Sequence, residues 1–317
     1  MPEEERYEAL KACKFVDEVV RGAPYELTEE WVDTLLEKYH IDFIVHGDDP
    51  CVTADGRDAY AYAKSKGIFK VIKRTEGVST TDIVGRMLLM TKEHHVMSPP
   101  PGDAEDLARR RSASYGMDTE ELEVRPAPAS RFLPTARRIK QFSTGAAPGP
   151  NDKVVYIAGD WDLFTAGHIS ILQTAAAMGD FLVVGVWDDA TVNKLRGRSF
   201  PVLNLHERAL SVLACRYADE VIIGAPYAIT PDLLRTMNVQ VVARCETELT
   251  PVLDGEDAYA VPESMGVVSA FTAPRVLSPQ DVINRVLEHR AAFENRYKSK
   301  AAKEASYHTD KAYVAEH

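Results

Sequence analysis

A histidine just inside a predicted helix is the first residue of this chain whose setting could do chemistry. The segment 159–168, GDWDLFTAGH, follows an apolar strand and places Gly167 and His168 at a helix start. Free backbone amides and the helix dipole favour bound negative charge there. A histidine donating to a phosphate oxygen would stabilise the charge that grows during nucleotidyl transfer. A histidine that only caps the helix explains these residues equally well.

An arginine and several hydroxyls precede a second predicted helix. The stretch 74–81 reads RTEGVSTT. A guanidinium offers a planar fork of donors for phosphate oxygens, and hydroxyls at a helix start add more. The ordinary alternative is a capping box of Ser79 with Asp82. Because capping explains neither Arg74 nor Gly77, the stretch predicts a phosphate-binding site.

One segment of the chain occurs twice. Residues 5–25 (ERYEALKACKFVDEVVRGAPY) and 207–227 (ERALSVLACRYADEVIIGAPY) align without a gap, 202 positions apart, with Pro24 and Pro226 as anchors. The identities include a cysteine, an Asp-Glu pair and the whole of Gly-Ala-Pro-Tyr. Self-similarity of this kind indicates a duplicated domain. We refer to the two halves as the first copy and the second copy.

Strands alternate with helices in both copies, which predicts an α/β protein with parallel sheets and ligands at the strand carboxyl ends. The expected strands are Ile41–Val45, Phe69–Ile72, Val154–Ala158, Phe181–Trp187, Val221–Ile223 and Val239–Ala243. Helix starts are expected at the capping residues Thr28, Asn204, Thr230 and Ser278.

Composition divides the chain into four parts. We expect a first domain over residues 1–95, a largely flexible linker over 96–150, a second domain over 151–297 and a tail over 298–317. The linker is rich in proline and glycine and has little periodicity.

Charge and cysteine usage narrow the functional class. The net charge of −11 argues against a nucleic-acid binder, whose surface would be basic. The four cysteines lack CxxC spacing and are expected to be reduced, with no metal site. The start MPEEER shows no secretory signal, and no window approaches the roughly 18 apolar residues of a membrane span. A cytoplasmic protein without a transmembrane segment is expected.

These motifs together resemble the cytidylyltransferase family, whose nucleotide-binding fold also occurs in HxGH adenylyltransferases. The resemblance covers nearly the whole chain and implies two Rossmann-like nucleotidyltransferase domains with parallel sheets, the first one incomplete. The stretches that carry it are DLFTAGH (162–168), RTEGVSTT (74–81), HGDDPCVTADGRDAY (46–60), SRFLPTARRIKQFS (130–143) and NLHERALSVLACRYADEVIIGAPY (204–227).

The duplicated layout is similar to members of this family that act in phosphatidylethanolamine synthesis. It implies that CTP and phosphoethanolamine react to give CDP-ethanolamine and pyrophosphate, normally with Mg²⁺. The compartment it implies is the cytoplasm, either free or peripheral at the endoplasmic reticulum membrane, and a homo-oligomer is left open. The nucleotide-binding residues carried over from the family pattern, with Gly167 and Lys194 of the second copy, are Arg74, Thr75, Gly77, Ser79, Thr80, His46, Gly47, Asp48 and Asp49, and the catalytic candidate is His168.

Both copies depart from the family pattern. The first copy has no counterpart of Lys153–Val202, roughly 50 residues, so we expect a shortened isoform or an incomplete gene model. In the second copy Thr165 stands where a histidine is expected, and the run-in Phe271–Pro274 lacks the arginine and glycine of the signature. We therefore expect a second domain that kept the fold and lost much of its site. The first copy, which lacks its own histidine turn, would depend on His168 of the second copy.

Two alternatives remain beside this interpretation. In the first alternative, the chain is a non-catalytic regulatory or decoy form that binds nucleotide weakly or not at all, which the departures from the family pattern favour. In the second alternative, the chain is a choline-phosphate enzyme of the same family. The duplication and the lack of a long basic amphipathic membrane helix disfavour this alternative.

Overall fold

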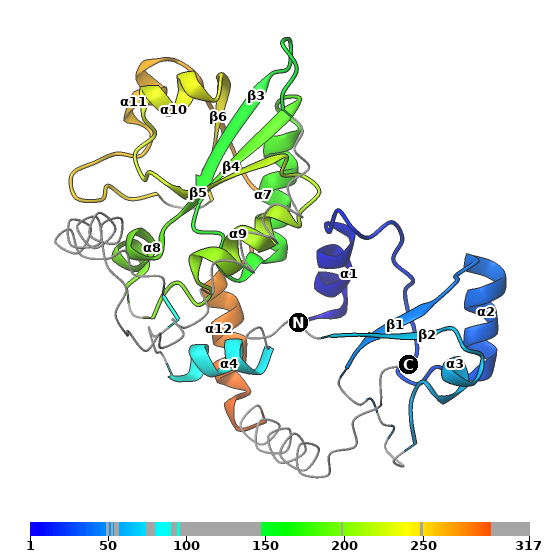
Figure 1. Ribbon diagram of the computed structural model, residues 1–317. Coiled ribbons are helices and arrows are strands. Elements are labelled where there is room, and N and C mark those ends of the chain that lie inside the picture. The colour runs from blue at the N-terminus through cyan, green and yellow to red at the C-terminus, as the bar shows by residue number, and fades with distance from the viewer. Residues whose placement is uncertain are drawn as a thin grey trace, which may run out of the picture. The chain divides into compact units, whose positions relative to one another are not determined.

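The computed structural model describes residues 1–48, 51, 53, 57–73, 80–89, 94–95, 147–197, 199–247 and 250–292. It divides into two compact units, residues 18–80 and a larger unit of residues 1–17 with 81–317. Helices and parallel strands build both units (Figure 1), which confirms the predicted α/β class. The tail and all of the predicted linker except 147–150 lie outside the described residues.

A five-stranded parallel sheet forms the centre of the larger unit. Its strand order is β5-β4-β3-β6-β7, so the winding direction reverses between β3 and β6. In sheets of this kind ligands bind beyond the strand carboxyl ends at that switch point. The strands are β3 (Val154–Gly159), β4 (Phe181–Trp187), β5 (Glu220–Ala225), β6 (Val239–Cys245) and β7 (Val268–Phe271). The sequence predicted four of them and missed β7.

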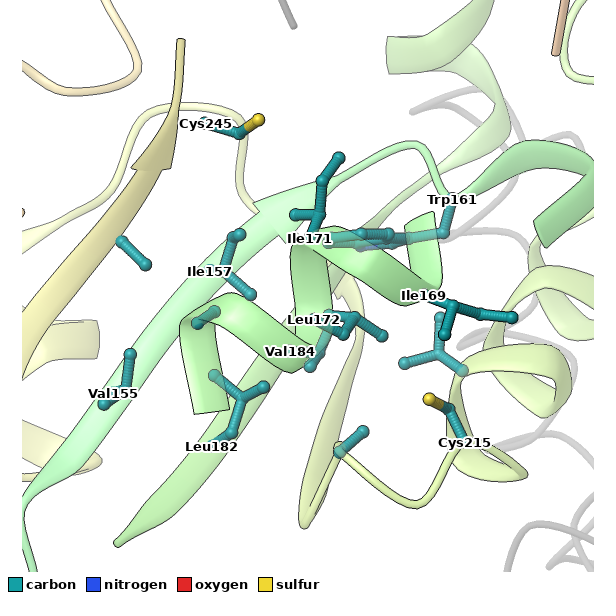
Figure 2. Close-up of a cluster of buried hydrophobic side chains, with 14 of the residues drawn as sticks. Val155, Ile157, Trp161, Ile169, Ile171, Leu172, Leu182, Val184, Cys215 and Cys245 are labelled. Carbon is teal, nitrogen blue, oxygen red and sulfur yellow. The ribbon is translucent and has the colours of Figure 1, made fainter. Parts of the chain in front are cut away.

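Helices cover both faces of this sheet, because side chains alternate along each strand. On β3, Val155 and Ile157 pack with α7 and α9, as Figure 2 shows for α7. Val154 and Tyr156 pack on the other face with α8, α10 and α11. These helices are α7 (Ala166–Ala176), α8 (Asp189–Arg196), α9 (Leu205–Leu213), α10 (Pro231–Thr236) and α11 (Ala260–Ser264).

The predicted helix starts are confirmed. Asn204 accepts the Glu207 amide at the start of α9, and Thr230 accepts the Leu233 amide at the start of α10. Ser278 forms a capping box with Asp281 on α12 (Pro279–Glu288). Each cap satisfies an amide that the helix itself leaves unpaired, so these boundaries follow from local sequence.

The smaller unit belongs to the first copy. It contains α2 (Glu29–Tyr39), β1 (Ile44–Gly47), α3 (Ala61–Ser65) and β2 (Phe69–Ile72), with Thr28 capping α2. The register of the parallel pair β1–β2 runs from Ile44 opposite Phe69 to Gly47 opposite Ile72. The pair β6–β7 has the equivalent register, from Val242 opposite Val268 to Cys245 opposite Phe271. The two-stranded sheet is therefore the first-copy counterpart of β6 and β7.

The repeated segment folds differently in the two copies. Residues 220–225 form strand β5, which pairs with β4. The matching residues 18–23 of the first copy form no strand, and within the described part of the chain no strand lies beside them. An apolar run becomes a strand only where a neighbour takes its backbone hydrogen bonds.

Equivalent positions of the two copies meet within the larger unit. The amide of Lys14 donates to Ala214 O at 2.9 Å, and the amide of Arg216 donates to Ala12 O at 2.8 Å, which makes Cys13 and Cys215 an antiparallel bridge. Contacts in which residue i meets j and j meets i define a two-fold interface. The N-terminal helix α1 (Glu3–Lys11) is held on the second copy in this way.

A second pair of equivalent elements packs in the same unit. Helix α4 (Thr80–Leu89) and helix α12 share an apolar cluster whose members are related by an offset of 199 positions. This offset follows the alignment of Ser79 with Ser278. The cluster includes Ile83, Val84 and Met87 from α4 with Val282, Ile283 and Val286 from α12. Helices α1 and α4 therefore group with the second copy, across the boundary that composition suggests.

Candidate functional site

The turn after β3 is built from residues in unusual backbone conformations. Trp161 and Leu163 have positive φ angles of 52° and 57°, a region that side chains other than glycine rarely occupy. Trp161 is buried, and its indole Nε1 donates to Gly185 O at 2.8 Å. Such strain persists only where surrounding structure enforces it. The turn, which contains the short helix η1 (Asp162–Phe164), is therefore rigidly held at the carboxyl end of β3.

His168 is the third residue of α7 and forms a capping box with Thr165, the N-cap of that helix. Its ring Nδ1 accepts the Thr165 amide at 3.0 Å, and Thr165 Oγ1 accepts the His168 amide at 3.4 Å. The capping interpretation is thus confirmed. Since Nδ1 is an acceptor, the neutral ring carries its proton on Nε2. The Nε2 proton is the one that this histidine would donate to a phosphate oxygen.

A carboxylate lies beside this proton. Asp160 Oδ1 is 3.9 Å from His168 Nε2, and Oδ2 is 2.9 Å from the Arg196 guanidinium. Burial alone would raise the pKa of Asp160, but Arg196 and His168 hold it below its ordinary value. Burial lowers the pKa of His168 to about 4 against the pull of Asp160. At neutral pH the pair is a neutral imidazole beside an ionised carboxylate.

Sequence reasoning missed the role of Asp160. It directly follows Gly159, the last residue of β3, and its side chain is 3% exposed. A buried aspartate directly after a strand was a signal in the sequence, but its partner Arg196 is 36 residues away. The carboxylate stands next to the helix start where an external anion was expected.

A second buried carboxylate ties the turn to the segment before α9. Asp162 accepts the amides of Val202 at 2.7 Å and Leu203 at 2.8 Å. Burial raises the pKa of Asp162 to about 7 despite these hydrogen bonds. Its role in the described structure is to hold the loop.

Gly167 and Thr165 contact the protein backbone closely. A Cβ added to Gly167 would lie 2.7 Å from Leu277 O, and Thr165 Oγ1 donates to the same carbonyl at 2.5 Å. The glycine is required because α7 starts against the residue before the α12 cap. Whether Gly167 also serves a nucleotide stays a prediction.

Lys194 pairs with a carboxylate on the surface, and three of the first-copy candidates lie at the end of strand β1. Lys194 Nζ lies 2.7 Å from Asp254 Oδ2 on the exposed surface. His46 and Gly47 end strand β1, the His46 ring lies 4.8 Å from that of Tyr60, and Asp48 follows. The strand end is the expected side of a parallel sheet for a ligand.

The signature residues are described only at their end. Thr80 is the first residue of α4, and its side chain is exposed. The other first-copy candidates, Asp49, Arg74, Thr75, Gly77 and Ser79, lie outside the described residues. Their predicted roles stay predictions.

Neither a metal cluster nor a membrane helix is found in the described part of the chain. No group of three or more His, Cys, Asp or Glu side chains there could hold a metal ion. Likewise, no helix in the described ranges has the length and apolar character needed to cross a membrane.

Known proteins are similar to this chain over nearly its whole length. The family model described as cytidylyltransferase-like matches residues 1–86 and 156–269, more than half of the chain. An ethanolamine-phosphate cytidylyltransferase from Arabidopsis thaliana is 45% identical over 320 residues, covering 99% of this chain and 75% of that protein. The chain belongs to the ethanolamine-phosphate cytidylyltransferase family. The Dictyostelium discoideum member is 43% identical over 314 residues, with 97% of this chain and 83% of that protein covered.

Similarity to the choline-phosphate branch is shorter. Choline-phosphate cytidylyltransferase A from Homo sapiens is 46% identical over 124 residues, which cover 39% of this chain and 29% of that protein. Identity is as high as in the ethanolamine-phosphate relatives, but it covers 39% of this chain where the Arabidopsis thaliana match covers 99%. The extent of the match therefore separates the two branches.

Proposed function

We propose that this chain transfers the cytidylyl group of CTP to phosphoethanolamine, giving CDP-ethanolamine and pyrophosphate in phosphatidylethanolamine synthesis. The observation that carries the proposal is similarity over nearly the whole chain to proteins named for this reaction. The five-stranded parallel sheet of the second copy supports it further, because its switch point lies at the end of β3, where the turn with His168 follows.

The first copy is proposed to bind CTP. Arg74 and the hydroxyls of Ser79 and Thr80 would hold the triphosphate at the start of α4, where free amides and the helix dipole add favourable interactions. His46 to Asp49, at the end of β1, would contact the nucleoside. A phosphate oxygen of phosphoethanolamine then attacks the α-phosphorus, and the bond to the β-phosphate oxygen breaks to release pyrophosphate.

His168 is proposed as the donor to the reacting phosphate. Its Nε2 proton is set by the Thr165 amide on Nδ1, and its lowered pKa keeps the ring neutral. Asp160 stands 3.9 Å from that nitrogen, so a phosphate has to displace the carboxylate. Asp160 therefore competes with the proposed role.

Mg²⁺ is proposed to arrive with CTP. When bound, it neutralises charge on the phosphate oxygens. The described residues hold no cluster that fits the ion, so none of the steps above is assigned to it.

A parallel assay tests the proposal. Purified protein with CTP and Mg²⁺ is expected to convert phosphoethanolamine and to leave phosphocholine unchanged. Arg74→Ala is expected to weaken CTP binding, since it removes the phosphate fork. The matched control is Arg235→Ala, which changes an arginine on the exposed surface of α10. Unchanged CTP affinity in Arg74→Ala would show that the phosphate role is wrong.

A non-catalytic form is the second candidate. Two observations favour it: Asp160 occupies the side of His168 that would face a phosphate, and the first copy shows a sheet of two strands in the described residues. Folded protein that yields no product under the conditions above would support this candidate.

A further inference from the structure

The helix after the nucleotide-binding signature is tied to the second copy by an ion pair. Arg86 on α4 contacts Glu207 on α9 through two bonds, Nη1 to Oε2 at 2.6 Å and Nη2 to Oε1 at 3.0 Å. Nη1 also donates to Val202 O at 3.2 Å. The two side chains are 16% and 15% exposed. A two-bonded, largely buried pair of this kind fixes both distance and orientation.

Glu207 is itself held in place. Its Oε2 accepts the Asn204 amide at 2.9 Å, and its own amide donates to Asn204 Oδ1 at 3.0 Å. This capping box ties the carboxylate to the start of α9. Arg86 therefore binds a group that the second copy has already positioned.

The internal repeat provides a matching pair. Arg285 on α12 lies 199 positions after Arg86, and Glu5 lies 202 positions before Glu207. Arg285 Nη1 contacts the two Glu5 carboxylate oxygens at 3.0 Å and 2.9 Å. Each copy thus offers an arginine on its last helix to a glutamate of the other, as in a two-fold interface.

The two pairs differ in what their helices carry. Helix α4 begins directly after RTEGVS, whereas ahead of α12 Ala273 and Val276 stand where the signature has Arg74 and Gly77. Arg86 is 16% exposed, but Arg285 is 42% exposed. The more buried of the two arginines therefore belongs to the helix with the signature.

We infer that Glu207 is a positioning residue, acting through Arg86, by which the second copy holds the CTP-binding helix of the first copy. This inference rests on the proposed function of residues 74–80. It assigns a task to a domain whose own signature is degraded. Positioning of binding groups by a rigid neighbour contributes to affinity because less ordering is left for the ligand to impose.

The test compares matched variants of the two pairs in the full chain. Arg86→Gln and Glu207→Gln are expected to raise the KM and Kd for CTP about tenfold with kcat within about twofold, because position rather than chemistry changes. Glutamine at position 207 keeps the capping box. Arg285→Gln is the control and is expected to leave the KM for CTP unchanged. Arg86→Gln/Glu207→Gln should match the single variants, since both remove one interaction.

Amide hydrogen exchange without nucleotide separates this inference from the proposed function. Arg86→Gln is expected to speed exchange in α4 by about tenfold through easier local opening, and Arg285→Gln to leave α4 unchanged. Wild-type protein that binds no CTP would overturn the proposed function, while the exchange result still decides whether the ion pair holds the helix. Unchanged α4 exchange, or CTP affinity equal in Arg86→Gln and Arg285→Gln, would overturn the inference.

Discussion

Cys13 and Cys215 occupy the same position of the duplicated segment and lie opposite each other as an antiparallel bridge. The bridge is reciprocal, because each neighbour of one cysteine bonds a neighbour of the other. Both cysteines are free thiols. Reciprocity of this kind is the local signature of a two-fold relation between the copies. In the larger unit, first-copy helices therefore pack on the second copy as one subunit of a dimer packs on another.

Matched arginines give the first prediction. Arg208 is buried, pairs with Asp189 at 2.7 Å and donates to three carbonyls, whereas its repeat equivalent Arg6 is exposed and donates to Met1 O. Arg208→Met leaves Asp189 buried without its cation, so it is expected to lower the free energy of unfolding by about 3 to 5 kcal/mol. Arg6→Met is expected to change it by less than about 0.5 kcal/mol. Urea denaturation of both variants measures the difference, and equal losses would contradict the assignment.

Gly167 supplies a second prediction. Gly167→Ala places a Cβ 2.7 Å from Leu277 O, a backbone atom that cannot move aside. We expect a loss of about 1 to 3 kcal/mol in stability, as for overpacked cores. The control is Gly85→Ala on α4, where the added Cβ meets nothing within 4 Å. It is expected to gain about 0.5 to 1 kcal/mol from helix propensity. Thermal melting compares them, and a stable Gly167→Ala protein would show that Leu277 is not the constraint.

The third prediction concerns Thr165. Restoring the histidine of the family pattern, Thr165→His, is expected to destabilise the fold by about 1 to 3 kcal/mol, because the site is 2% exposed and the hydroxyl bonds Leu277 O. Thr165→Ser keeps that hydroxyl and is expected to cost less. Chemical denaturation ranks the two variants. A more stable histidine variant would mean that the position has room for an imidazole.

The buried histidine predicts how stability depends on pH. The pKa of His168 is lowered to about 4, from an ordinary 6.5. Between these values the unfolded chain binds more protons than the folded one, so this contribution is present above pH 6.5 and is lost as the pH falls to 4. The loss is on the order of 3 kcal/mol. His168→Gln keeps an acceptor for the Thr165 amide and is expected to flatten the profile in that window. Denaturation midpoints from pH 4 to 7 test this, and parallel profiles would contradict it.

Asp162 gives stability a pH dependence opposite to that given by His168. Its pKa is raised to about 7, so the folded protein binds the extra proton between about pH 4 and 7, and this contribution is lost as the pH rises through that range. Asp162→Asn, which cannot ionise, is expected to remove the decline while keeping an acceptor for Leu203. The same pH series measures it. A steeper decline in the variant would show that burial does not govern this carboxyl.

The amino-acid sequence by itself determined the local features of this protein. Caps such as Asn204 with Glu207 involve residues three positions apart, and apolar runs such as Phe181–Trp187 are read directly. The duplication, the α/β class and the family also follow from it, because identities at one offset need no coordinates.

Only the tertiary structure decided which contacts these segments make. Residues 18–23 and 220–225 share a motif, yet only the second forms a strand, because β4 lies beside it. Arg86 is 121 positions from Glu207, and Asp160 is 36 from Arg196. Partners at such separations are chosen by packing of the whole unit, since burial and backbone pairing depend on neighbours that local sequence does not name.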